Sequence, residues 1–158
     1  MPQITVDYSR TIAPAFATLF GARQDERIRS GFTRSFRLVL VVTLPVAAAA
    51  IALGPELVSL VYGSQYEGVA QPLRIMLFAF PLMGLSSLAG AHLAGLGRVR
   101  VSLTANALGA AADIGLALAF VPLFDASGAA IANAGGQVVH ALVLLAVSAS
   151  VLGRNGWR

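Results

Sequence analysis

Five polar side chains in two neighbouring apolar stretches are the groups of this chain best suited to chemistry or ligand contact inside a membrane. Asn106 and Asp113 are seven residues apart, which is two helical turns, so they share one helix face. Asn133, Gln137 and His140 follow the i, i+4, i+7 spacing and form a polar stripe on the next helix. Such faces predict a cation or proton site, or one wall of a hydrophilic cavity.

Asp113 is the most informative of the five, because an ionisable group near the middle of a span is costly unless it is paired, protonated or hydrated. A second interpretation is an interhelical hydrogen bond that locks two helices together and contributes about 1 kcal/mol. His92, with Ser86 and Ser87, is the comparable polar feature of the preceding apolar stretch. The residue types alone leave both interpretations open.

Arg10 is a further candidate for a cavity residue. Residues 8–20 are predicted to be part of a shortened helix, and Arg10 would then lie at membrane depth. A charge at that depth usually faces a bundle interior or a watery cavity. If the chain begins at Met1, Arg10 instead lies at the outer interface and extends its charged head towards water.

The composition indicates a membrane protein. Of the 158 residues, 57% are hydrophobic and only 11% are charged, against about a quarter in soluble domains. The sequence has no Cys, which excludes disulfides, thiolate catalysis and Cys-ligated metals. It also lacks a phosphate-binding Gly-rich loop, paired His at metal spacing and a nucleophile elbow. We therefore expect no enzyme activity, no cofactor and no metal and, because the Arg residues border apolar runs, no nucleic-acid partner.

Four runs are long enough to cross a bilayer, which takes about 20 residues at about 1.5 Å each. They are residues 36–53, 72–96, 101–123 and 127–152. Each is apolar around most of its circumference, unlike a surface helix with one polar face. The sequence thus predicts an all-α fold, a polytopic transmembrane helix bundle of four full spans with a partial N-terminal helix at residues 8–20.

The distribution of Arg predicts the orientation of these spans. All eleven strongly basic residues are Arg, and nine of them lie before the first run, between the second and third, or after the fourth. The opposite loops, residues 54–72 and 122–126, contain acidic residues and no Arg. Because positive charge marks cytoplasmic loops, the C-terminus is predicted to be cytoplasmic and residues 54–68 external.

Residues 54–68 combine turn residues, an acidic pair and aromatic residues between two apolar runs. They are predicted to form a short interfacial helix over residues 55–61 and a tight turn at Tyr62 and Gly63. Tyr62 and Tyr66 are suited to the headgroup layer.

Other residues predict how the helices are shaped and packed. Residues 21–37 are typical of an Arg-rich loop, and Pro45 and Pro81 are expected to kink or locally unwind their spans. Small residues four apart predict helix contact faces. These are Gly128, Ala132 and Gly136 in the last span, and Gly90 and Ala94, beside Ala91 and Gly95, in the second.

Residues 57–66, with the sequence LVSLVYGSQY, resemble a segment that polysaccharide-biosynthesis flippases carry between two helices of their C-terminal half. Those flippases belong to the multidrug/oligosaccharidyl-lipid/polysaccharide exporter superfamily. Further segments resemble the same family in the same order. They are Pro14 with the Arg-rich residues 21–37, Leu44-Pro45, residues 93–98 as a cytoplasmic turn, and residues 121–123 with 128–132 as the start of the last core helix.

The resemblance implies that residues 1–158 are the C-terminal portion of a multi-pass transporter of the bacterial cytoplasmic membrane. Such a transporter has two related halves of about six helices each and exposes a central cavity alternately to either side. Its partners would be membrane lipids and its substrate a lipid-linked oligosaccharide. The family's cavity Arg residues have no counterpart in this chain except Arg10.

The length of the chain departs from that pattern, because four full spans cannot form both halves. The chain is therefore expected to be a fragment or truncated product, or to associate with a missing N-terminal half or another membrane subunit. Two alternatives to a flippase remain. One is a cation-coupled multidrug exporter of the same superfamily with Asp113 as coupling site, and the other is a non-transporting membrane subunit or truncated remnant.

Topology reporters test the predicted orientation. A reporter fused after Ser64 is expected to be external and one fused after Arg154 cytoplasmic, because Arg-rich loops stay on the cytoplasmic side. Paired phosphatase and fluorescent-protein fusions measure the side at each position, and the reverse pattern would overturn the orientation.

Overall fold

The computed structural model describes residue 14, residues 17–22 and residues 25–153. Its elements are helix α2 (Asp25–Tyr62), the short 3-10 helix η1 (Ser64–Val69), helix α3 (Ala70–Gly95) and helix α4 (Val99–Gly153). Three helices in this part of the chain are long and apolar enough to cross a membrane. The predicted all-α membrane helix bundle is thereby confirmed for the described residues.

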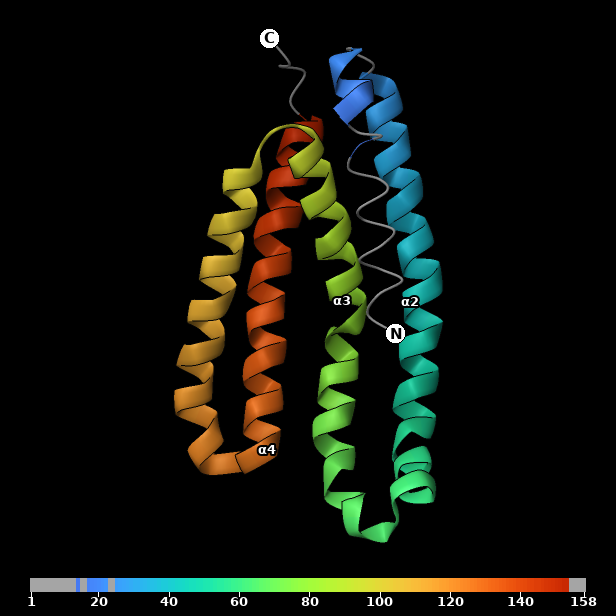
Figure 1. Ribbon diagram of the computed structural model, residues 1–158, viewed down its shortest axis with the longest axis vertical. Helices are drawn as coiled ribbons and strands as arrows, with labels where there is room; N and C mark the ends of the chain where they lie inside the picture. The colour runs from blue at the N-terminus through green and yellow to red at the C-terminus, as the bar shows by residue number, and fades with distance from the viewer. Residues whose placement is uncertain (1–13, 15–16, 23–24, 154–158) are drawn as a thin grey trace.

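Helix α4 turns back on itself at Asp125, whose backbone has φ 49° and ψ −123°. Its first arm, residues 99–124, and its second arm, residues 126–153, run antiparallel (Figure 1). The turn is tight, since a Cβ atom added at Gly128 would collide with the carbonyl group of Phe120. The two arms correspond to the third and fourth apolar runs of the sequence.

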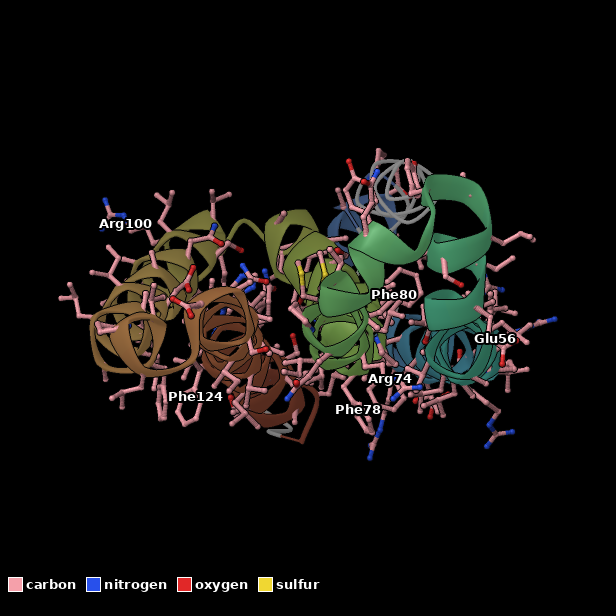
Figure 2. The ribbon with its side chains drawn as sticks, turned by 90° about the horizontal axis from the view of Figure 1, so that it is seen from below. Glu56, Arg74, Phe78, Phe80, Arg100 and Phe124 are labelled. Atoms are coloured by element: carbon pink, nitrogen blue, oxygen red, sulfur yellow. The ribbon has the colours of Figure 1, made fainter. Side chains whose placement is uncertain are left out.

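The helices stand in a row. Seen along their axes, the first arm of α4, with Arg100 and Phe124, lies at one end, and α2, with Glu56, lies at the other (Figure 2). The second arm of α4 and α3 lie between them, and the Ser148 hydroxyl donates a hydrogen bond of 3.5 Å to the Ala89 carbonyl across that contact. The beginning of α2 and the end of α4 are at the same end of the molecule (Figure 1).

Two glycines with positive φ form the turns between these elements, a conformation that costs Gly little. Gly97 (φ 72°) follows α3, where the Arg98 amide donates to the Leu93 carbonyl at 2.8 Å and the Gly97 amide to the Ala94 carbonyl at 2.9 Å. This is the Schellman pattern of a helix end. Gly63 (φ 88°) ends α2 and confirms the turn predicted there.

Helix α2 corrects two predictions. Residues 25–37 are helical and not an Arg-rich loop, and residues 55–62 continue the same helix through Pro55 and do not form a separate interfacial helix. With 38 residues, α2 is about 57 Å long. The apolar core of a bilayer is about 30 Å thick, so α2 extends well beyond it.

The structure bears on the two predicted helix breakers and on the two predicted rows of small residues. Pro45 and Pro81 lie inside continuous helices, and neither one ends its helix. In the last span the predicted row of small residues is buried throughout, as expected for a contact face. In the second span Ala94 is exposed, so that row is a contact face only in part.

The apolar core joins α2, α3 and both arms of α4 near the end of the molecule where α2 begins. Leu88, Leu93 and Leu144 are almost completely buried there, and His92 lies among them with its ring centroid 4.8 Å from that of Phe32. The core consists of Ile28, Phe32, Val39, Leu85, Leu88, Ala89, Leu93, Leu96, Ala105, Leu144 and Val151.

The outer surface is also apolar, as a lipid-facing surface is. Phe78 of α3 and Leu118 of α4 are 74% and 76% exposed. Burial inside lipid brings no hydrophobic driving force between helices, so close packing and interhelical hydrogen bonds hold the bundle together.

Leu93→Ala tests the core. Leu93 has no exposed surface, so its truncation leaves a cavity and is expected to lower the free energy of unfolding by about 2–4 kcal/mol. Leu118→Ala makes the same chemical change on the lipid-facing surface and is expected to cost less than about 0.5 kcal/mol. Reversible denaturation in detergent micelles measures both, and equal losses would contradict the assignment of the core.

Candidate functional site

A cavity of about 210 Å³ lies between the two arms of α4. The five polar residues that the sequence predicts as two faces line this cavity, together with three small residues. The lining residues are Asn106, Gly109, Ala110, Asp113, Asn133, Gly136, Gln137 and His140.

The sequence spacing explains why the polar groups converge. Asn106 and Asp113 are on one face of the first arm, and the stripe of the second arm faces them because the arms are antiparallel. Asn106 is exposed, whereas Asp113 and the three residues of the stripe are half-buried. The cavity is therefore open beside Asn106 and more enclosed towards Asp113.

Two glycines bring the arms together at this point. A Cβ atom added at Gly136 would lie 2.8 Å from the Gly109 carbonyl oxygen and 2.8 Å from the Asp113 Cβ. One added at Gly109 would lie 3.0 Å from both the Gly136 carbonyl oxygen and the His140 Cβ. A side chain at Gly136 would force the arms apart and one at Gly109 would fit only tightly, so this close approach sets the width of the cavity.

Asp113 lies deep in the span. It is twelve residues before the turn at Asp125, which corresponds to about 18 Å along the helix. Half the apolar thickness of a bilayer is about 15 Å, so the carboxyl group lies near the middle of the membrane. None of the side-chain hydrogen bonds between described residues involves Asp113.

The lining groups can bind a polar solute through hydrogen bonds or through the charge of Asp113. The amides of Asn106, Asn133 and Gln137 each offer donors and acceptors, as hydroxyl groups require, and the His140 ring adds one of each when neutral. Asp113 is the one charged residue among the described residues of the lining, and its carboxylate favours a cation over an anion at that position. Within the described part of the chain, no three His, Asp or Glu side chains gather as a metal site would require.

The structure thus brings together five of the six residues chosen from the sequence, and their roles remain a prediction. Arg10 lies outside the described residues. His92 is in the apolar core beside Phe32 and does not line the cavity. Gly109 also belongs to the site and was not predicted, although it lies three residues after Asn106 and four after Ala105, which was the signal that the sequence offered.

In a comparison with known protein families, the family model MatE matches residues 10–121. The matched segment includes α2, α3 and most of the first arm of α4, and therefore Asn106 and Asp113. Searches of curated proteins and of solved structures give no significant match.

Gly136→Ala tests the close approach of the arms. The added methyl group meets backbone atoms, so the arms must separate, and the free energy of unfolding is expected to fall by about 1–3 kcal/mol. Gly115→Ala is the matched control, since a Cβ atom there has no neighbour within 4 Å. It is expected to be neutral or to stabilise the helix by up to about 1 kcal/mol. A Gly136→Ala protein as stable as the wild type would refute the contact.

Proposed function

This chain belongs to the MatE family of membrane transporters, and we propose that it forms part of a transporter that moves a lipid-linked oligosaccharide across the bacterial cytoplasmic membrane. In this proposal the chain supplies helices and a polar cavity and catalyses no covalent step. The remaining helices come from a missing N-terminal half or from another membrane subunit, and the C-terminus is cytoplasmic.

The observation that carries the proposal is the lining of the cavity in α4. Three amides, one imidazole and one carboxylate surround a space of about 210 Å³ near the middle of the membrane. Sugar hydroxyls both donate and accept hydrogen bonds, and paired amide and carboxylate groups satisfy both needs. The resemblance of residues 57–66 to polysaccharide-biosynthesis flippases supports the same class of substrate.

The packing of the helices suits a protein that changes shape. Its apolar core joins α2 and α3 to α4 near the end where α2 begins. The two helix turns at the other end, η1 and the bend at Asp125, contribute no residue to that core. The large apolar side chains of the bundle thus pack near one end, an arrangement compatible with the rocking that alternating access requires.

A second candidate function is a cation-coupled multidrug exporter of the same superfamily. It is favoured by Asp113, because this carboxylate is the single charge among the described residues that line the cavity, and none of those residues is an Arg. A carboxyl group at that depth is tolerated when it is protonated or when its ionised form binds a cation. Here Asp113 would carry the coupling ion, and the amides would complete its coordination.

Complementation tests the proposal. The complete gene is expected to restore growth to a bacterial strain that lacks its own flippase for lipid-linked sugars. Asp113→Asn is expected to lower the restored transport rate roughly tenfold or more, because a hydrogen bond to a charged group contributes about 1.5–3 kcal/mol. Accumulation of the lipid-linked sugar on the cytoplasmic side measures the rate.

Asp125→Asn is the control for this substitution. It removes the same charge from the same helix, but Asp125 is exposed at the turn and does not line the cavity. Asn has nearly the same size and shape as Asp, so the turn is expected to keep its structure. The control should transport at the wild-type rate. Failure of the wild type to complement, together with drug resistance on expression, would exclude the flippase and favour the exporter.

A further inference from the structure

The beginning of α2 has a strongly basic face that neither the core nor the cavity of α4 uses. An open groove of about 590 Å³ lies along it. The described residues of its lining all belong to this helix and comprise three Arg residues, two hydroxyl residues and one acid. They are Glu26, Arg29, Ser30, Thr33, Arg34 and Arg37.

Helical periodicity separates this face from the packed side of α2. The lining residues follow the i, i+3, i+4, i+7 pattern from position 26 and continue it to position 37, so they share one side of the helix, and all of them are exposed. Ile28, Phe32 and Val39 are buried in the core on the other side. The three Arg side chains are therefore not needed to hold the bundle together.

Apolar residues continue the same face towards the middle of the helix. Val41 follows Arg37 after four residues, and Leu44 follows three residues later, so that both lie in line with the groove. They are 64% and 52% exposed. One side of α2 thus presents guanidinium groups and then, further along, exposed hydrocarbon.

The depth of the Arg residues fits a membrane interface. The apolar run begins at about residue 36, which places Arg37 and Arg34 at the headgroup layer. Arg29 is eight residues before Arg37, about 12 Å further from the apolar layer. The headgroup layer is about 5–8 Å thick on each side, so the groove extends from the apolar boundary into water.

We propose that this face of α2 binds an anionic glycerophospholipid, with the phosphate held by Arg34 and Arg37 and the acyl chains lying along Val41 and Leu44. A guanidinium group offers paired donors that match the oxygens of a phosphate. The hydroxyls of Ser30 and Thr33 donate to the carbonyls of Arg27 and Arg29, at 3.2 Å and 3.0 Å. The phosphate therefore takes its hydrogen bonds from the Arg side chains.

Two features favour a lipid over a soluble anion. A free anion would gain nothing from the exposed apolar residues next to the groove, whereas a lipid covers them with its acyl chains. Glu26, the acid in the lining, is eight residues before Arg34 and so lies about 12 Å along the helix from it, away from the membrane. Its charge is therefore displaced from the phosphate position and does not oppose binding there.

Spin-labelled lipids test the assignment in the full chain reconstituted into phosphatidylcholine bilayers. Labelled phosphatidylglycerol is expected to be immobilised by the wild type at least about fivefold more strongly than labelled phosphatidylcholine, because basic residues near the surface attract anionic lipid. Arg34→Gln/Arg37→Gln should abolish this preference. High salt should weaken it in the wild type.

Arg98→Gln/Arg100→Gln is the matched control, since it removes two exposed Arg residues at the turn between α3 and α4. Arg100 lies at the opposite end of the row of helices from α2 (Figure 2). The control should keep the preference, and circular dichroism should show the same helix content in both variants. An equal loss in the two variants, no loss in either, or displacement of the labelled lipid by millimolar inorganic phosphate would each refute the lipid site.

Discussion

The hydrocarbon of a bilayer cannot form hydrogen bonds with a polypeptide backbone, and this constraint governs both the fold and the site. Every peptide group within the membrane must find its partner inside a helix, so the chain crosses as long helices joined by short turns. Polar side chains face the same penalty, and five of them gather where the two arms of α4 meet. The apolar remainder is free to face lipid.

The elements inside the apolar layer could be predicted from the sequence because composition and length decide them. The apolar runs, the turns at Gly63 and Gly97 and the reversal before Gly128 all follow from residue types with strong preferences. The segments outside that layer could not be predicted in the same way. Residues 25–37 and 55–62 are rich in charge or turn residues, yet a helix that already exists extends at little cost, because nucleation is the costly step.

The candidate site, too, could be predicted from the sequence only in part. Spacing along one helix identified Asn106 with Asp113, and the three residues of the second arm, as single faces. Spacing does not tell which helices are neighbours or how close they come, and the backbone contact between Gly109 and Gly136 sets that distance. The glycine row of the second arm is visible in the sequence, and its partner Gly109 follows Ala105 after four residues, but one such pair in an Ala-rich arm does not tell which helix it contacts.

The length of α2 gives the protein a mechanical property. Its basic beginning extends about 15–20 Å beyond the apolar layer without a turn, and Ile28 and Phe32 pack it against the rest of the bundle. A tilt of the bundle by about 10°, well within the range that membrane helices adopt, moves this end of α2 by about 3 Å. Any movement of the bundle inside the bilayer is therefore converted into a displacement at its surface, where other molecules can sense it or resist it.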